Sequence, residues 1–399
     1  MQNNCMNICT QFAGQAKRVY LGWLAGVALA CGMAVSAPAL AGDEGVTPTE
    51  IRIGASAVLT GSLGPQTTEY TVGSRLYFDA VNAAGGVHGR RIVYSTMDDA
   101  FDVKRAVENT RKLIEEDKVF LIYNTTGTAH TAAILPLAER SRTVVFGPVT
   151  GASSLRDTVH RYLFHVRASY ANEARKIVSQ VKRVGITRMG AFYQDDAFGK
   201  ALLEEVRRAA QEEGMTITGE FAVDPKNPDF NAVAAATAQA SPQAVVLCTA
   251  GTMFTSYIKA VQQGTPLRPR YYGFSVASLD VINRELGPLG RGIVLAQIMP
   301  SLKNTAVPVV LEYRKLLAAK DPDAAPSASQ FEGFVHAKVL VDALRAAGRN
   351  LTTDSFIRGL ESIGEIAYGP FKARYSPTDH NGSSYVELAI VDVHGQLRF

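Results

Sequence analysis

Short apolar segments alternate with amphipathic segments along this chain, and no other feature constrains the fold as much. In the first half the apolar segments lie at 51–58 ("IRIGASAV"), 90–97, 118–123 and 143–148. Each is too apolar for a sheet with one face in water, which is typical of parallel strands covered on both sides. Strands that alternate with helices predict βαβ units with right-handed crossovers. The sequence therefore predicts an α/β fold with a parallel-sheet core.

The alternation starts again after about residue 167. The second series predicts helices at 170–184, 197–213, 229–240 and 252–263, and strands at 187–193, 215–223, 243–249 and 270–275. Two series of roughly five strands each favour two lobes over a single very wide sheet. Within the first series, Asp102 stands just before an amphipathic helix and is a candidate N-cap.

The segments between the two series are short and lack the composition of a flexible linker. They lie near 166–168, 295–298 and 368–371, which predicts a hinge of three crossings. Helices at 305–321, 327–347 and 352–363 would return to the first lobe, and strands at 371–376 and 385–393 would complete the second. The predicted lobes are 48–166 with 297–370, and 167–296 with 371–399.

Residues 1–41 have the pattern of a secretory signal peptide. Lys17 and Arg18 precede an apolar run, and Ala39-Leu40-Ala41 offers a small-residue cleavage site before Gly42. We therefore expect cleavage near Ala41-Gly42 and export to the periplasm. Two alternatives are an uncleaved transmembrane anchor and lipidation at Cys31.

Composition excludes several classes of protein. A hydrophobic content of 47% and a charged content of 20% indicate a folded globular chain. Without the leader only Cys248 remains, so no internal disulfide can form and a cysteine metal site is disfavoured. The net charge of +4 falls to +2 when Lys17 and Arg18 are removed, which gives no support to a nucleic-acid partner.

Open α/β sheets bind ligands beyond the carboxyl ends of their strands, so the loops that follow the strands are the candidate sites. These loops lie at 59–66, 124–128, 147–154, 194–200, 248–253 and 273–278. The segment Asn124-Thr125-Thr126-Gly127-Thr128 joins a strand to a helix and carries no charge. Its hydroxyls and the N–H groups of a helix start could hold a carboxylate, or the threonines could simply cap the helix.

Enzyme and metal signatures are absent from the sequence. There is no G-x-S-x-G, no phosphate loop, no G-x-G-x-x-G after a strand and no H-E-x-x-H, and the seven histidines are scattered. Asp195 and Asp196 are expected to cap the following helix, and His130 is expected to be solvated. We therefore expect a binding protein with no metal and no cofactor, and not an enzyme.

Several segments resemble the Leu/Ile/Val-type periplasmic binding proteins, which are substrate-binding components of ABC transporters. They include "IRIGASAVLTGSLG", "YFDAVNAAGGVHGRRI", "VTGASSLRD", "FYQDDAFGKALLEEV" and "GPFKARYSPTDHNG". The likeness extends over 48–399. It implies the type I fold, with two Rossmann-like lobes joined by a three-crossing hinge, and a receptor that closes on a small molecule and delivers it to a membrane permease.

The resemblance also implies which residues contact the ligand. Carried over position by position, the contacts fall on Gln66, Thr126, Gly127, Thr128, Val149, Thr150, Gly151, Phe198, Thr249, Gly251, Thr252 and Ser275. Amino-acid binders of this family hold the ligand ammonium with an acid where this chain has Ser275, and they carry an aromatic residue where it has Gln66. Either another acid serves here, or the ligand has no α-ammonium group.

These observations favour a solute-binding receptor of an ABC importer that captures a branched-chain amino-acid-like ligand or another small carboxylate. The expected partners are the small molecule and an inner-membrane ABC permease, with no nucleic acid, and the chain is expected to be a monomer. Two alternatives stay open. One is a ligand-sensing domain that signals to a membrane partner, and the other is an exported enzyme.

Overall fold

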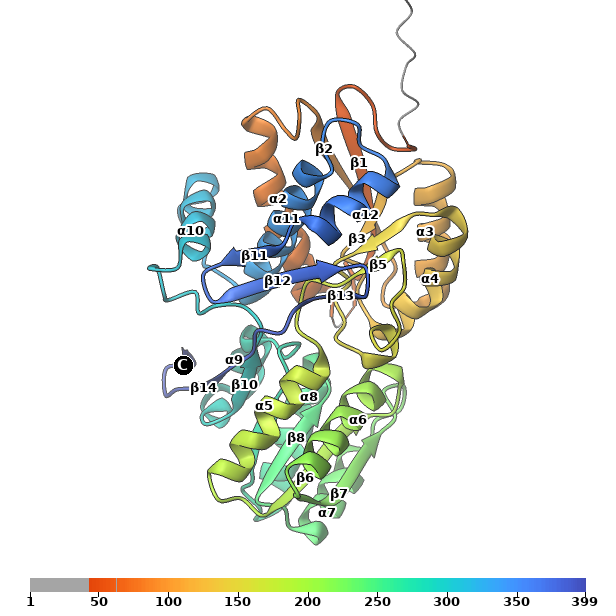
Figure 1. Cartoon of the computed structure of the whole chain (residues 1–399). Coiled ribbons are helices and arrows are strands. Elements are labelled where there is room, and N and C mark those ends of the chain that lie inside the picture. Colours follow the sequence, from red (N-terminus) through yellow and green to blue (C-terminus); the bar gives the residue numbers. More distant parts are fainter. Residues whose placement is uncertain (1–42, 62) are drawn as a thin grey trace, which may run out of the picture. The chain divides into compact units, whose positions relative to one another are not determined.

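The computed structural model describes residues 43–61 and 63–399 (Figure 1). The predicted leader, its cleavage site and Cys31 lie outside these residues. The first sheet is entirely parallel, in the order β2-β1-β3-β4-β5. Its strands are β1 (Glu50–Ala57), β2 (Arg91–Asp98), β3 (Leu121–Tyr123), β4 (Val144–Phe146) and β5 (Leu163–Phe164).

Helices cover both faces of the first sheet, as the apolar strands predict (Figure 1). On β3 the side chains alternate: Leu121 and Tyr123 join the cluster around α2 and α11, whereas Ile122 joins the cluster with α3 and α4. These helices are α2 (Gly64–Ala83), α3 (Val103–Glu115), α4 (Thr128–Ser141) and α11 (Ala328–Ala346). Asp102 caps α3 as predicted, since its side chain accepts a hydrogen bond from the N–H of Arg105.

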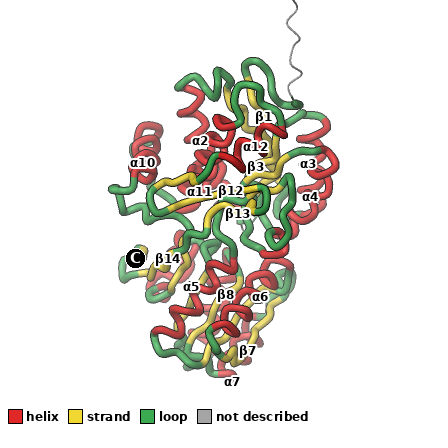
Figure 2. Tube along the Cα trace, in the orientation of Figure 1, coloured by secondary structure: helices red, strands yellow, loops and turns green. Residues whose placement is uncertain are grey.

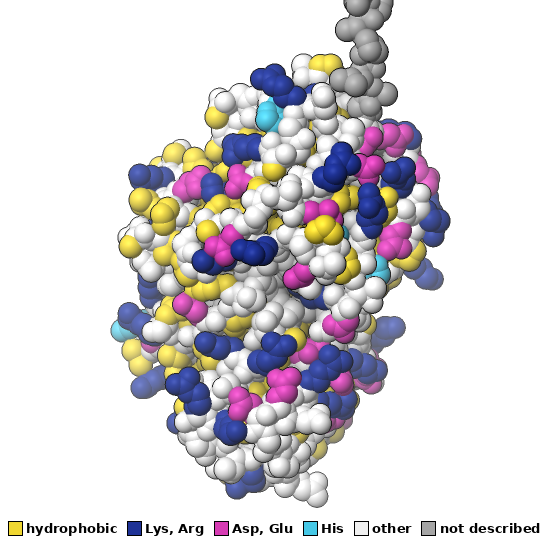
Figure 3. Space-filling model, viewed as in Figure 1, with side chains coloured by type: hydrophobic (Ala, Val, Ile, Leu, Met, Phe, Trp, Pro, Cys, Tyr) yellow, Lys and Arg dark blue, Asp and Glu magenta, His cyan; other side chains and the backbone are white. Residues whose placement is uncertain are grey.

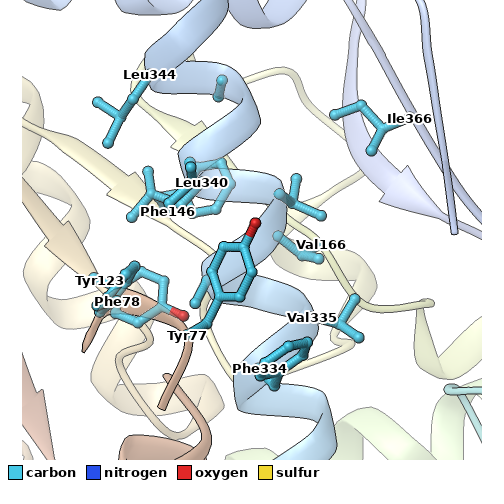
Figure 4. Packing of buried hydrophobic residues seen from close by; sticks show 14 of the residues in the cluster. Tyr77, Phe78, Tyr123, Phe146, Val166, Phe334, Val335, Leu340, Leu344 and Ile366 are labelled. Atoms are coloured by element: carbon cyan, nitrogen blue, oxygen red, sulfur yellow. The ribbon is translucent and has the colours of Figure 1, made fainter. Parts of the chain in front are cut away.

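Helices α2 and α11 pack so closely that each presents a glycine to the other's backbone. A Cβ on Gly73 would overlap the carbonyl oxygen of Gln330, and one on Gly333 would overlap the carbonyl oxygen of Tyr70. Figure 4 shows the core beside this contact, where Phe334 and Leu340 of α11 lie among aromatic side chains such as Tyr77. The rings of Tyr77 and Phe334 meet edge to face at 5.0 Å. Helix α11 therefore returns late in the sequence to complete the first core.

The second sheet has the order β15-β14-β10-β9-β8-β6-β7, and only the pairings of β14 are antiparallel. Figure 2 shows its strands β7, β8 and β14 among helices. Its strands are β6 (Arg188–Gln194), β7 (Thr216–Val223), β8 (Ala244–Cys248), β9 (Arg270–Gly273), β10 (Val294–Gln297), β14 (Glu387–Val391) and β15 (Leu397–Arg398). Helices α5 (Tyr170–Arg183) and α6 (Ala197–Glu212) cover one face. Helices α7 (Phe230–Ala240), α8 (Gly251–Gly264) and α9 (Leu279–Leu286) cover the other.

A third, antiparallel sheet contradicts one prediction from the sequence. It consists of β11 (Glu365–Tyr368), β12 (Phe371–Ser376) and β13 (Asp379–Ser383). The segment 371–376 was expected to complete the second sheet, and that expectation is wrong. Strand β12 buries alternate side chains (Phe371, Ala373 and Tyr375) in the core of the first sheet. Strand β14 does join the second sheet as predicted for 385–393, and β15, which was not predicted, pairs beside it.

The remaining helices are α10 (Pro308–Lys320), α12 (Thr353–Ser362) and the short 3₁₀ turns Ser153–Leu155 and Gly287–Gly290. Cys248 is buried in β8 with a free thiol. None of the helices in the described part of the chain is long and apolar enough to cross a membrane. Basic and acidic side chains are interspersed on the face shown in Figure 3.

Candidate functional site

A cavity lies beyond the carboxyl ends of parallel strands from the first and second sheets. The first sheet's side contributes Gln66 and Tyr70 from α2, Thr126 and Gly127 from the β3–α4 loop and Val149 after β4, and the second contributes Tyr170, Gln194, Phe198, Ala250 and Val276. Leu63, Thr67 and Phe101 complete the lining. The space open to the centre of a water-sized sphere is about 60 Å³. Because one water needs about 10–15 Å³ by that measure, the cavity holds only a few atoms.

Backbone pairing beyond the ends of β3 and β4 fixes the loop that carries the threonine cluster. The N–H of Val149 donates to the carbonyl of Thr125 at 2.8 Å, and the N–H of Gly127 donates to the carbonyl of Val149 at 3.3 Å. Gly127 has a φ of +107°, a conformation that side chains other than hydrogen rarely permit. The loop therefore turns sharply into α4 at the cavity.

Three helices begin at this cavity without a side-chain cap. Their N-cap residues are Leu63 for α2, Gly127 for α4 and Ala250 for α8, and all three line the cavity. Of the other α-helices in 63–399, only α10 also lacks a side-chain cap; the rest have one, such as Asp196 on α6. Uncapped helix starts leave N–H groups without acceptors and carry partial positive charge, so the starts of α4 and α8 favour an anion. At α2 the N–H of Gly64 donates to the carbonyl of Gly61 at 3.2 Å and Pro65 has no N–H, so this start offers fewer donors.

The threonine cluster at 124–128 does not cap helix α4, contrary to one of the two interpretations of the sequence. No threonine side chain in 124–128 caps α4. The side chain of Thr126 is 8% exposed, lines the cavity and has no hydrogen-bond partner among the described residues. Thr128 is hydrogen-bonded instead to Thr150, with 2.9 Å between the hydroxyl oxygens. The hydroxyl of Thr126 is thus available to a ligand.

The lining itself is uncharged and largely aromatic. No Lys, Arg, Asp, Glu or His is among the described residues that line the cavity. The aromatic rings come from Tyr70, Phe101, Tyr170 and Phe198, and the rings of Tyr170 and Phe198 lie 6.1 Å apart. The amide of Gln66 donates to the carbonyl of Val276 at 3.0 Å. Such a site provides apolar contact for a ligand's body and backbone donors for a negative end.

Ser275 faces away from this cavity into a buried ionic cluster. Its N–H and hydroxyl donate to the carboxylate of Glu173 at 2.7 and 3.1 Å, and its hydroxyl accepts from the guanidinium of Arg167. Burial raises the pKa of Glu173 to about 7, although Arg167 and the hydrogen bonds from Ser275 oppose the rise. A carboxylate therefore stands behind Ser275, but it is fully buried, already bonded and absent from the cavity wall.

Arg167 links this cluster to α11. Its side chain is fully buried, 3.9 Å from Glu173 and 3.5 Å from Glu332. Burial alone would lower the pKa of Arg167, but Glu332, Tyr170 and Glu173 outweigh it and raise the pKa. The guanidinium therefore stays charged and holds together the segment 165–169, helix α5 and helix α11.

His336 gives this cluster a measurable pH dependence. Burial, and then the charge of Arg167, lower the pKa of His336 to about 3. A histidine pKa below its unfolded value of about 6.5 stabilises the fold above pH 6.5, and this stability is lost as the pH falls toward 3. Between pH 6.5 and 4, His336 should lower the free energy of unfolding of the wild type by up to about 1.4 kcal/mol for each unit by which the pH falls. In His336→Gln this part of the fall should be absent. Urea titrations of both proteins across this range measure it.

Because Glu173, Glu332 and His165 are present in both proteins, the comparison isolates His336. Parallel stability curves for the wild type and His336→Gln would contradict the assignment.

The structure brings five of the predicted site residues to the cavity wall: Gln66, Thr126, Gly127, Val149 and Phe198. The others do not line it. Thr128 and Thr150 are hydrogen-bonded to each other, and Gly151 packs against Tyr170. Thr249 donates to Gln194 at 2.7 Å, and Gly251 and Thr252 lie in the first turn of α8. Ser275 is bonded to Glu173.

The sequence interpretation missed most of the aromatic wall. Tyr70 lies four residues after Gln66 on α2, so helical spacing could have identified it. Tyr170 is the first residue of α5, directly after the predicted crossing. The prediction that His130 is solvated was wrong: its ring is 2% exposed and stacks on Phe101 at 4.6 Å. Asp196 caps α6 as predicted, whereas Asp195 pairs with Lys200.

Known proteins resemble this chain in sequence and in fold. Residues 50–396 match the Periplasmic binding protein family. A Leu/Ile/Val-binding protein homolog 8 from Brucella abortus is 23% identical over 349 residues, which cover 82% of this chain and 83% of the relative.

Two solved structures are similar over most of the described fold. One is a substrate-binding periplasmic protein from Ralstonia solanacearum, with a TM-score of 0.80 and 28% identity over 87% of this chain and 99% of that one. The other is a possible leucine/isoleucine/valine-binding protein from Rhodopirellula baltica, with a TM-score of 0.81 and 24% identity over 89% and 98%.

These matches confirm the predicted type I fold with its parallel-sheet cores. The family consists of substrate-binding proteins rather than enzymes, which agrees with the expectation from the motifs. In open α/β sheets, ligands bind in the crevice beyond the carboxyl ends of the strands. The match over 50–396 is decisive, and the chain belongs to the periplasmic binding protein family as one of its ligand-binding receptors.

Proposed function

We propose that this receptor serves an ABC importer and that its ligand is an organic acid without an α-ammonium group. The observation that carries the ligand class is the convergence of three uncapped helix starts on a cavity with no charged side chain in its wall. Helix starts and the free hydroxyl of Thr126 stabilise a carboxylate. An ammonium group there would be desolvated without a counter-charge, which is costly.

Glu173 does not supply the missing counter-charge. Its carboxylate is bound by Ser275 and paired with Arg167, and it does not line the cavity. The relatives' names refer to leucine, isoleucine and valine. The proposed ligand has a carboxylate, as these amino acids do, but lacks their amino group. None of the three is therefore proposed as the ligand of this chain.

Matched pairs of ligands test the proposal. Calorimetry would compare leucine with its des-amino analogue isocaproate, and phenylalanine with hydrocinnamate. We expect the des-amino acids to bind more tightly than their amino-acid partners. Tighter binding of the amino acids would overturn the ligand class, and loss of ligand uptake in a strain without the permease would support the importer role over signalling.

Thr126→Val is expected to weaken binding of the tightest acid from this panel by about ten- to a hundredfold. A hydrogen bond to a charged group contributes about 1.5–3 kcal/mol, and the valine side chain keeps the shape of threonine without the hydroxyl. The same calorimetric titration on the variant measures this effect.

Thr128→Val is the matched control, because its hydroxyl bonds to Thr150 behind the cavity wall. It should lower stability by about 1 kcal/mol and change affinity less. Equal loss of affinity in both variants would contradict a direct role for Thr126.

The two lobes are proposed to close on the ligand about three crossings. Val166 and Ala168 belong to the core cluster of the first sheet and Tyr170 belongs to that of the second, which supports a crossing at 168–170. The second crossing follows β10, and the third is proposed at 384–386, between β13 and β14, rather than at 368–371. Small-angle scattering with and without saturating ligand tests closure, and an unchanged radius of gyration would contradict it.

We further propose that the chain is exported and cleaved between Ala41 and Gly42, leaving a monomer in the periplasm. The charged, apolar and small-residue parts of 1–41 support cleavage there. N-terminal sequencing of the exported protein tests it, and a chain that begins at an acylated Cys31 would contradict it.

A further inference from the structure

Phe101 has a strained backbone at the wall of the cavity. Its φ is +62°, and the φ of the preceding Ala100 is +49°. Residues that carry a side chain rarely adopt a positive φ, and two such residues in succession persist only where the surrounding contacts enforce them. Strain of this kind is concentrated at functional sites. The position of the Phe101 ring therefore has a cost that a role in binding would explain.

Two carboxylates enforce the turn that contains Phe101. The N–H of Phe101 donates to the side chain of Asp99 at 2.9 Å. The N–H of Ala100 donates to the side chain of Asp98, also at 2.9 Å. Asp99 is fully buried and accepts a further hydrogen bond of 2.7 Å from the hydroxyl of Ser56 in β1. The turn is therefore anchored to the first sheet.

The ring of Phe101 packs against the start of α4. It stacks on the ring of His130 in the first turn of that helix, with 4.6 Å between the ring centroids and 24° between the ring planes. His130 is itself buried, so the ring of Phe101 cannot withdraw in that direction. A Cβ on Gly127 would lie 3.1 Å from Cε2 of Phe101 and 2.6 Å from Nδ1 of His130. Phe101 is therefore a fixed wall directly beside the helix start.

The same ring lines the cavity together with Thr126 and Gly127. A carboxylate that is bound by the Thr126 hydroxyl and the N–H groups of α4 has its α-carbon next to this helix start. The α-carbon is then the part of the ligand that lies against the ring of Phe101. A branch on that carbon would overlap a ring that has no room to move.

We propose that Phe101 is a specificity-determining residue that excludes organic acids with a branched α-carbon. The inference rests on the proposed function, because that proposal places the carboxylate at the helix start. It adds a limit on shape to a ligand class defined by charge. Branches further along the ligand do not meet this ring and are accepted.

Two isomeric acids test the proposal by calorimetry. Isovalerate and pivalate have the same composition and charge, but pivalate carries its methyl groups on the α-carbon, whereas the α-carbon of isovalerate is unbranched. One methylene group more or less in an apolar pocket changes selectivity by about 10–200-fold. We therefore expect the wild type to bind isovalerate at least about tenfold more tightly than pivalate.

Phe101→Ala is expected to remove most of this preference, because it frees the space of the ring beside the α-carbon. Phe101→Leu keeps an apolar side chain against His130 and so disturbs the fold less, and its preference is expected to be intermediate. The ratio of the two affinities is the readout. A loss of fold stability, or an effect of the uncovered His130 on the carboxylate, would change the binding of both isomers alike.

Phe198→Ala is the matched control. Phe198 also lines the cavity, but its ring packs against Tyr170, with 6.1 Å between the ring centroids. Loss of this ring should weaken the binding of both acids and leave the ratio of their affinities close to the wild-type value.

The outcomes separate this inference from the proposed function. Equal affinities of the wild type for isovalerate and pivalate overturn the inference and leave the ligand class intact. A preference for isovalerate that survives both Phe101 variants also overturns it, as does an equal loss of preference in Phe198→Ala. Failure of every organic acid to bind overturns the proposed ligand class and the inference with it.

Discussion

Replacing Arg167 by methionine is expected to lower the free energy of unfolding by about 3–5 kcal/mol. Methionine keeps most of the volume but removes the charge that compensates Glu173 and Glu332, whose side chains are 0% and 5% exposed. Removing one partner of a buried ion pair leaves the other charge desolvated and uncompensated. Urea denaturation at neutral pH measures the change.

Arg161→Met is the matched control. Arg161 pairs with Asp354 at 2.9 Å, but its side chain is 60% exposed, and such surface pairs contribute at most about 1 kcal/mol. Replacing Glu173 and Glu332 by glutamine in the Arg167→Met background should restore part of the stability, because no buried charge then remains. Equal effects of Arg167→Met and Arg161→Met would show that the cluster does not stabilise the fold.

Gly333→Ala is expected to destabilise the protein by about 3 kcal/mol, the upper end of the usual range for overpacking. The added Cβ would overlap the carbonyl oxygen of Tyr70 on α2, and a backbone atom cannot move aside as a flexible side chain can. Ser74 fixes the contact further, because its hydroxyl lies 2.8 Å from the carbonyl oxygen of Tyr70 and 3.0 Å from that of Gly333. Thermal and urea unfolding both measure the loss.

Gly264→Ala provides the control, since Gly264 ends helix α8 and a Cβ there meets no atom within 4 Å. That change should be neutral or slightly stabilising, because alanine has the higher helix propensity. Wild-type stability of Gly333→Ala would mean that α2 and α11 can separate without cost.

Most of the α/β architecture could be predicted because inner parallel strands such as β3, β4 and β8 are continuous buried apolar segments. The strand β12 was assigned to the wrong sheet for a physical reason. Its side chains alternate, with Phe371 inward and Lys372 outward, which is typical of an antiparallel strand with one solvent-exposed face. The alternation does not indicate which sheet the strand joins. Which sheet such a strand joins depends on where the chain crosses from one lobe to the other. The short loops at the crossings have no sequence pattern that marks the crossing.

The site was only partly predictable because side-chain direction is a tertiary property. The structure places part of the threonine cluster at a cavity wall, but only the structure separates Thr126, which lines the cavity, from Thr128, which bonds to Thr150. The carboxylate that Ser275 contacts could not be predicted either. Glu173 lies 102 residues away in sequence, and no local pattern relates it to Ser275.

A crystal structure of the protein with its tightest-binding organic acid tests the central claim most directly. We expect the carboxylate to lie within hydrogen-bond distance of the Thr126 hydroxyl and of N–H groups at the start of α4 or α8, with no acidic side chain in contact with it. A ligand held through an ammonium group by Glu173 or Glu332, or bound outside the cavity that contains Gln66 and Phe198, would contradict the account.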